Sequence, residues 1–392
     1  MTRTALLWMK LTSEPLVALY TLLPFILRKD LHASAIQISL FTSLKPVLAV
    51  LAYYLSAYHA KNGKSVYQNL MHTWVLAYLP FLLFPWLGNY AYLLLAASCY
   101  QLFSKAVTPP LMEILKQNIP KTARESIFSK SFMFCFVESA LLGLFIGKIL
   151  DWNGGSWQVL FSISSLIALS SYHIQRKIPK TSASLSIKFK HKNPLLDPLK
   201  ESLVLMKQDR DFKHFQMGFM IGGSALMFIT PALPIYYADV LLLSHGEVSQ
   251  ARFILMAFGV LISSTIWKNF LHNSSINKLM PWITIGFGLY PLCVLFSNVN
   301  VAFFIYGIAQ AGSHLIWHLS GTIFSKDGDS TPYTAVNILS QGLRGLIVPF
   351  LGGVACTFFG PVPVMIVGSL TSFIGAYVMY RSAYLSNPEQ VY

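Results

Sequence analysis

The sequence predicts an all-α membrane protein of about twelve transmembrane helices, arranged as two pseudo-symmetric six-helix bundles. Composition and patterning both support this fold class. Hydrophobic residues make up 54% of the 392 residues and charged residues only 11%, whereas soluble domains average about 25% charged residues. The apolar residues gather in runs of roughly 20, the length that a helix needs to cross a bilayer. A soluble protein this apolar would expose large hydrophobic patches and aggregate.

The first six runs form a predicted N-terminal bundle, residues 1–175. Lys10 and Glu14 interrupt the first run and no small-residue cleavage motif follows it, so we interpret it as a retained span and not as a signal peptide. Gly88 and Asn89 mark a short turn between the third and fourth runs. The runs cover residues 8–27, 36–59, 67–87, 90–112, 127–150 and 157–175.

A polar and basic stretch, residues 176–212, separates this set from the next. Within it, Asp197 suits the N-cap of a helix and Pro198 its first position. The residues that share one apolar face of this helix are Leu199, Leu203 and Met206. We predict a cytoplasmic basic linker with a short amphipathic helix at the membrane surface.

The second six runs form a predicted C-terminal bundle, residues 213–392. Asn298 and Asn300 mark the turn between the ninth and tenth runs. Six spans, a linker and six more spans indicate an internal duplication of the kind found in transporters. The runs cover residues 213–237, 249–271, 279–297, 299–324, 333–357 and 362–384.

The net charge of +14 predicts the orientation of the chain in the membrane. The basic residues form short clusters between apolar runs and no stripe that could follow a phosphate backbone, which argues against nucleic-acid binding. If the N-terminus is cytoplasmic, most of them fall on the cytoplasmic side, and only Arg28 and Lys29 lie in an outer loop. We expect a multi-pass protein of the inner (plasma) membrane with both termini in the cytoplasm.

Neither a cofactor nor a metal site is expected. The cysteines lie inside apolar runs without CxxC spacing, which indicates small buried hydrophobes and not ligands or disulfides. They are Cys99, Cys135, Cys293 and Cys356. The sequence has no convergent catalytic pattern, so we expect no enzyme.

Two short motifs lie in the loop after the second run and at the end of the fourth. In the first, residues 56–65 align with the pattern G-x-x-x-D-R-x-G-R-R. The turn glycine, Gly63, and the basic positions Lys61 and Lys64 are retained, but Ala60 replaces the acid. The second motif consists of Pro109, Pro120 and Arg124 at fixed spacing. With these two motifs and the two sets of six runs, the chain resembles the major facilitator superfamily over its whole length.

This resemblance implies a secondary active transporter that works by alternating access. The expected partners are the lipid bilayer, a small organic solute and a coupling ion, most simply a proton, and the expected state is a monomer. It also implies an inner gate built from Lys61, Gly63 and Lys64. Glu113 and Arg124 are further gate candidates, and the alternative is that these two are solvated loop charges.

Glu14 and Glu138 are the only acids well inside the predicted spans. Intramembrane acids usually face a cavity or a partner, and either glutamate could bind and release the coupling proton. The alternative is structural, because Lys10 lies four residues before Glu14 on the same helix face and could neutralise it.

Lys45, Lys105 and Arg344 are the basic residues proposed to contact the solute. The guanidinium of Arg344 is a fork-shaped donor suited to a carboxylate or a phosphate, which hints at an anionic solute. The alternative is that Arg344 pairs with an acid or with carbonyl groups between helices.

His314, Trp317 and His318 lie close together in the tenth run, the two histidines at positions i and i+4 of one face. They could form a proton relay or an aromatic shelf for the solute. Ordinary packing is the alternative. A metal pair is not favoured, because no third ligand is near in sequence.

Other functions remain open from the sequence. The first is efflux of hydrophobic compounds, although the fifth run lacks the G-P-x-x-G-G pattern of many drug antiporters. The others are a solute-sensing receptor and a membrane-embedded enzyme that modifies lipids.

Overall fold

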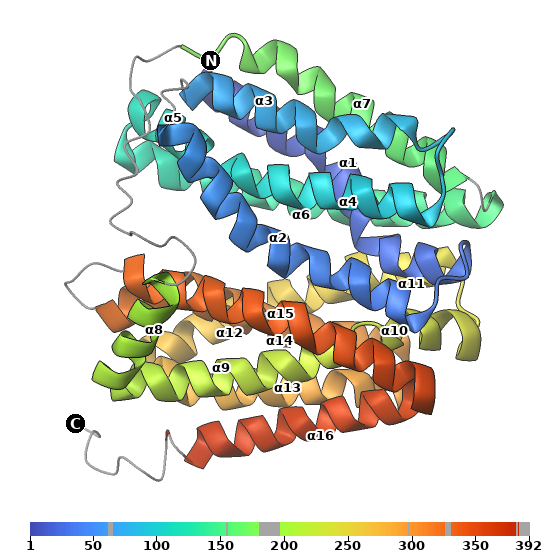
Figure 1. Ribbon diagram of the computed structural model, residues 1–392, viewed down its shortest axis with the longest axis vertical. Helices are drawn as coiled ribbons and strands as arrows, with labels where there is room; N and C mark the ends of the chain where they lie inside the picture. Colours follow the sequence, from blue (N-terminus) through green and yellow to red (C-terminus); the bar gives the residue numbers. More distant parts are fainter. Residues whose placement is uncertain are drawn as a thin grey trace. The chain divides into compact units, whose positions relative to one another are not determined.

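The computed structural model describes residues 1–61, 66–153, 156–179, 197–296, 298–325, 331–381 and 383. Within these ranges every regular element is a helix, as Figure 1 shows. The predicted all-α fold is therefore confirmed. The count of twelve membrane crossings stays a prediction.

The helices from the first half of the sequence follow the predicted runs. They are α1 (Thr2–Lys29), α2 (Ala35–Lys61), α3 (Val66–Tyr78), the 3-10 turn η1 (Leu79–Leu83), α4 (Tyr90–Ala106), α5 (Thr108–Asn118), α6 (Lys121–Trp152) and α7 (Ser156–Gln175). Two predicted runs are broken at prolines. Pro80 lies in the first turn of η1, and Pro109 and Pro110 lie in the first turn of α5, because proline lacks the N–H that continues a helix.

The remaining helices begin with α8 (Asp197–Gln208), which starts where the N-cap signal predicts the amphipathic linker helix. The others are α9 (Arg210–Ile229), α10 (Ala232–Ile235), α11 (His245–Gln250), α12 (Met256–Asn273), α13 (Ile276–Phe296), α14 (Val299–Ser325), α15 (Thr331–Phe359) and α16 (Pro361–Tyr380). Two π-helical turns, Tyr236–Val240 and Ala251–Leu255, continue α10 and α11.

Eight helical stretches in the described part of the chain are long and apolar enough to cross a membrane. They are Thr2–Lys29, Ala35–Ala52, Arg210–Val240, His245–Asn273, Ile276–Phe296, Val299–Ser325, Val336–Phe359 and Pro361–Tyr380.

The chain forms two compact units. Unit 1 comprises Met1–Ala33, Leu44–Phe189 and Leu243–Gln250. Unit 2 comprises Ser34–Ser43, Lys190–Leu242 and Ala251–Tyr392. A short part of α2 thus belongs to unit 2, and α11 belongs to unit 1. The predicted domain limits at residues 175 and 213 stay a prediction.

In unit 1, hydrogen bonds from α7 stabilise the break at Pro80. Ser165 Oγ donates to the carbonyl oxygen of Tyr78 at 2.6 Å, and Ser162 Oγ to that of Phe81 at 2.9 Å. The indole Nε1 of Trp74 donates to the carbonyl oxygen of Ala168 at 3.0 Å. Because lipid offers no water to satisfy exposed carbonyl groups, such bonds let α3 end inside the bundle.

In unit 2, glycines bring helices α12 and α14 into close contact. A side chain at Gly259 would collide with the carbonyl oxygen of Phe304, and one at Gly307 with that of Met256. Two apolar helices gain little from the hydrophobic effect in lipid, so association depends on such close packing. The buried core of unit 2 includes Phe212, Phe215 and Leu279.

Candidate solute and coupling sites

Glu14 lies at the centre of a polar cluster inside unit 1. Its carboxylate accepts a hydrogen bond from the hydroxyl of Ser139 on α6. Cys135, one turn earlier on α6, and Lys10, one turn earlier on α1, also interact with it. Lys10 thus interacts electrostatically with Glu14, which is also hydrogen-bonded to another helix, and the roles proposed for Glu14 stay predictions.

Three tyrosines surround this cluster. The ring centroids of Tyr20 and Tyr100 are 4.9 Å apart, and those of Tyr78 and Tyr100 are 5.8 Å apart. Tyr78 and Tyr100 are buried, and so is Gln101, which hydrogen bonds to Tyr20. The hydroxyl of Ser13 is bonded to Tyr78. Buried polar side chains are costly unless they are paired, and here the tyrosine hydroxyls and their partners satisfy one another.

Glu138 lies on α6, close enough to Glu14 for the two charges to interact. Its Oε2 atom is buried and has no hydrogen-bond partner among the described residues. It also lines an open groove of about 490 Å³ between α1, α6 and α7. The other lining residues are Trp8, Leu11, Thr12, Leu166, Ile167 and Ser170. Two neighbouring carboxyl groups in apolar surroundings repel each other unless one of them holds a proton.

Lys105 on α4 adds a second positive charge to the cluster in unit 1. Its side chain is exposed, and its charge interacts with that of Lys10 on α1. Lys10 thus interacts both with Glu14 and with Lys105. Lys45, the third basic candidate of the first half, lies on α2 with its side chain exposed.

Arg344 is buried inside unit 2, with only 5% of its surface exposed. It donates a hydrogen bond from Nη1 to the carbonyl oxygen of Phe219 on α9, and its guanidinium lies 4.5 Å from the centroid of the Phe219 ring. The buried Nε has no hydrogen-bond partner, and no carboxylate of the described residues forms an ion pair with Arg344. The Nε–H of this guanidinium therefore lacks an acceptor within the described structure.

The tenth predicted span, α14, contributes one of its three candidates to this region. Trp317 stacks on Phe219 with 5.6 Å between ring centroids, so it extends the aromatic surface beneath Arg344. His314 is exposed, and its ring bonds to Gln310 of the same helix at 3.1 Å. The side chain of His318 lies outside the described residues, so the histidine relay stays a prediction.

A hydrogen-bonded chain of uncharged residues crosses unit 2 near this position. Gln216 on α9 donates to Asn337 on α15, and Asn337 Nδ2 donates to the hydroxyl of Ser320 on α14 at 2.8 Å. All three are buried, and Oε1 of Gln216 has no partner. The sequence prediction does not include these residues, because it rests on charged side chains. Amide side chains inside apolar helices are the signal that could have identified them.

The inner-gate candidates are only partly described. Glu113 accepts a hydrogen bond from Gln117 of the same helix at 2.8 Å. Gly63 and Lys64 lie outside the described residues, as do the side chains of Lys61 and Arg124. The gate therefore stays a prediction.

A charged cluster that no sequence motif predicts lies at the far end of α1. We call it the Asp–His–Asp cluster (Asp30, His245 and Asp151). The imidazole of His245 lies between two carboxylates, with 3.1 Å from Nε2 to Asp30 and 3.2 Å from Nδ1 to Asp151. Asp30 follows α1, Asp151 lies in the last turn of α6 and His245 begins α11, so no local pattern predicts them. No group of three or more His, Cys, Asp or Glu residues is placed to hold a metal in the described structure.

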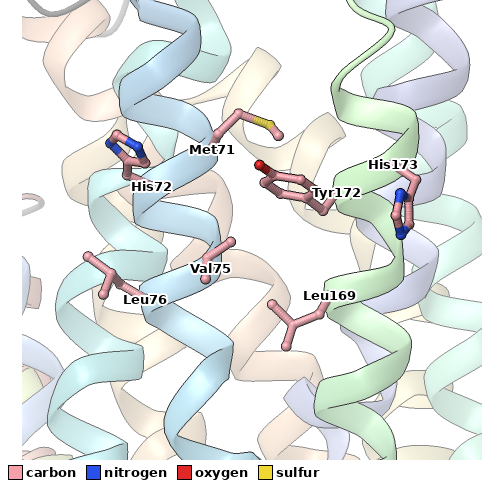
Figure 2. Close-up of a pocket in the computed structure, with 7 residues that line it drawn as sticks. All are labelled: Met71, His72, Val75, Leu76, Leu169, Tyr172 and His173. Carbon is pink, nitrogen blue, oxygen red and sulfur yellow. The ribbon is translucent and has the colours of Figure 1, made fainter.

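A second open groove, of about 550 Å³, lies between α3 and α7. Figure 2 shows the side chains of Met71 and Tyr172 facing each other across it, with Leu169 and Val75 further along. His72, Leu76 and His173 complete the lining. Solute sites usually bring several polar groups together, whereas this lining is largely apolar and suits contact with lipid.

Comparison with known proteins gives a family. The family model described as the Major Facilitator Superfamily matches residues 16–343. No curated protein sequence matches the chain.

Solved structures with the same fold are distant in sequence. A mutant of the nucleoside transporter NupG is 10% identical, with a TM-score of 0.76 over 97% of this chain and 99% of that one. A mutant peptide transporter POT is 12% identical, with a TM-score of 0.75 over 97% and 94%. A bacterial homologue of the human lysosomal transporter Spinster, inward-facing and unoccupied, is 13% identical, with a TM-score of 0.64 over 98% of both chains. Identities this low show the fold alone.

Proposed function

This chain belongs to the Major Facilitator Superfamily, and we propose that it is a proton-coupled transporter of a small organic anion. Membrane transport follows from the family and from the fold that the chain shares with solved transporters, so the protein is a transporter and not an enzyme. The solute, the coupling ion and alternating access are the proposed part.

The observation that carries the anionic solute is the buried guanidinium of Arg344. Removing a charge from water without a counter-ion costs several kcal/mol. Within the described structure Arg344 has a carbonyl and an aromatic ring as partners but no acid. A carboxylate or phosphate of the solute would supply the missing negative charge to its free Nε.

Glu14 and Glu138 are the proposed proton carriers. Glu14 has a hydroxyl partner, and a buried oxygen of Glu138 has no partner in the described part of the chain, so a proton on either would relieve the repulsion between them. Coupling then needs only that solute binding change which glutamate holds the proton.

The first test measures binding by thermal stabilisation of the purified protein. The ligands are a panel of mono- and dicarboxylates and of phosphorylated metabolites, with uncharged nucleosides and sugars beside them. We expect at least one anion to raise the melting temperature of the wild type, and Arg344→Gln to weaken its binding by about 30-fold or more, because a buried charged pair is lost. The control Arg3→Gln removes an exposed arginine and should leave binding unchanged. Stabilisation by uncharged compounds only would contradict the proposal.

The second test measures uptake of the identified anion into vesicles with an imposed pH gradient. Glu14→Gln and Glu138→Gln should abolish acceleration by the gradient but retain exchange of solute against solute. Asp211→Asn, which changes an exposed acid in the first turn of α9, is the matched control. If the variant that carries both substitutions keeps its gradient-driven uptake undiminished, neither residue has a coupling role.

A second candidate function is efflux of a hydrophobic cation. It is favoured by the groove between α1, α6 and α7, where apolar side chains and Trp8 surround the partnerless oxygen of Glu138. Cells that lack the gene would then become more sensitive to lipophilic cations, and Glu138→Gln would not restore resistance. Unchanged sensitivity leaves the anion transporter as the better proposal.

A further inference from the structure

The Asp–His–Asp cluster holds a segment of the chain in place. The segment Leu243–Gln250 belongs to unit 1, whereas the residues directly before and after it belong to unit 2. The backbone N–H groups of His245 and Gly246 donate to the carboxylate of Asp151 at 2.7 and 2.8 Å. His245 is 4% exposed and packs edge-on against Phe25 with 5.4 Å between the ring centroids.

Further contacts seat the same segment closely on α1 and α6. The ammonium of Lys29 donates to the carbonyl oxygen of Leu243, and Ser249 Oγ donates to that of Gly143 at 2.6 Å. A side chain added at Gly147 would lie 2.7 Å from the Cα of Gly246, so the two backbones touch.

The chemistry of the cluster depends on one proton. A carboxylate only accepts hydrogen bonds, and each ring nitrogen of His245 faces one carboxylate. A neutral imidazole has a single N–H and can satisfy only one of the two, whereas the imidazolium satisfies both with charge-assisted bonds. Burial alone would raise the pKa of Asp151, but the bonds from Gly246 and His245 outweigh it and lower that pKa, so Asp151 stays charged near neutral pH.

We propose that His245 is a proton-binding site whose occupancy controls how firmly unit 1 holds the segment Leu243–Gln250. With the proton bound, both aspartates accept charge-assisted hydrogen bonds from the imidazolium, and the segment stays packed on unit 1. Without the proton, one of the two hydrogen bonds between the ring and the aspartates is lost, and the segment is released more readily. The predicted topology puts this end of α1 on the outer side, so the proton would come from the outer medium.

Other charged groups lie on the elements that pack against His245. Arg28 donates to the carbonyl oxygen of Ala33, and Glu247 accepts from the backbone N–H of Ser244, so both have other partners. The charged residues of the elements that meet here are Arg28, Lys29 and Asp30 at the end of α1, Lys148 and Asp151 on α6, Glu247 on α11, and Arg252 in the π-helical turn after it.

This inference rests on the proposed function only in requiring that a transporter change conformation, and it does not depend on the solute. A conformational equilibrium that a proton at His245 shifts would provide a second pH-sensing step besides Glu14 and Glu138.

The experiment uses the full-length protein in nanodiscs, without solute. It measures how accessible a cysteine on the buried face of the segment is to a thiol reagent. Ser249→Cys is buried in the closed segment, and Trp86→Cys, at a residue 77% exposed, serves as the reference for the pH dependence of thiol chemistry. Both are placed in a background in which the four native cysteines are replaced by serine. A membrane-impermeant maleimide labels each from pH 5.5 to pH 8.5.

We expect the labelling rate of Ser249→Cys relative to the reference to rise about tenfold over this range, as one charge-assisted bond is lost. With His245→Gln added, the relative rate should be high at every pH, and with His173→Gln, an exposed histidine elsewhere on unit 1, the rise should persist. Asp30→Asn keeps the fold of the segment while removing one charge, and should raise the relative rate at pH 5.5 several-fold.

A relative rate that does not change with pH in the wild type, or a rise of equal size in His245→Gln, would overturn the proposal. Neither outcome affects anion binding at Arg344, so the failure of this inference and that of the proposed function are separable.

Discussion

At the scale of single residues, the protein keeps its few buried charges in three different environments. Arg344 has a carbonyl group and an aromatic face, Glu14 has a serine and a nearby lysine, and His245 has two carboxylates. Only the last is a charge balanced by opposite charges on both sides. Since unbalanced buried charge is costly, the first two environments suit groups that meet a ligand or a proton during transport, and the third suits a contact that closes and opens.

Asp151→Asn tests the stability that the Asp–His–Asp cluster contributes. Because the pKa of Asp151 is lowered in the folded protein, its carboxylate stabilises the fold above the pKa of the unfolded chain, about 3.9, and this contribution is lost as the pH falls through the folded value. The apparent melting temperature of Asp151→Asn should be about 2 °C below that of the wild type at pH 7, and the difference should shrink below about pH 4.

Circular dichroism melts in detergent from pH 3.5 to pH 7 provide the measurement. Asp239→Asn, an acid in the π-helical turn of unit 2, is the comparison. A deficit of Asp151→Asn that grows toward acid would mean that the carboxylate destabilises the fold.

At the scale of helices, the sequence pattern and the structure agree where apolar length decides, and they differ at prolines. The predicted runs at residues 67–87 and 90–112 are each divided, at Pro80 and before Pro109. Helix propensity alone would place breaks at every proline, but Pro15, Pro24 and Pro46 lie inside continuous helices. What decides is whether a neighbouring helix satisfies the freed carbonyl groups, as Ser162 and Ser165 do for the break at Pro80.

The close crossing of α12 and α14 is open to a test by substitution. Gly307→Leu should prevent the approach of the two backbones and so reduce the yield of monodisperse protein at least several-fold, because the new side chain meets the carbonyl group of Met256. Leu261→Ala, on the exposed side of α12, is the matched control and should keep the yield within about twofold. Size-exclusion chromatography from equal membrane mass measures both. Equal profiles for the two variants would show that the crossing tolerates separation.

At the scale of the whole molecule, the predicted orientation is the main expectation that the fold leaves untested. The bias of Lys and Arg between alternate loops predicts that both termini and the linker at residues 176–212 lie in the cytoplasm. The shared fold says how helices pack and not which side of the membrane they face.

Labelling of single cysteines in whole cells tests this orientation. A cysteine within residues 180–210 should react with a membrane-impermeant maleimide only after the cells are opened. Trp86→Cys and Trp152→Cys, at exposed residues next to predicted outer turns, should react in intact cells. The reverse result would invert the topology and with it the side from which His245 receives its proton.

The sequence by itself determined the properties that depend on neighbours along the chain. Apolar runs of sufficient length predict the helices, Asp197 and Pro198 predict the start of α8, and glutamates inside apolar runs predict Glu14 and Glu138 as residues to examine. The all-α membrane fold follows from these features because lipid requires each backbone group to be satisfied within its own helix.

Only the tertiary structure decided which distant side chains meet. Asp30, Asp151 and His245 are separated by about a hundred residues or more, and none lies in a motif, yet they form one charged cluster. Likewise, among the described residues Arg344 contacts a ring and a carbonyl group on α9 and no acid, which the sequence left open. The physical reason is that hydrogen bonds and charge pairs act over a few ångströms, and those distances are set by how helices pack, not by how far apart residues lie in the chain.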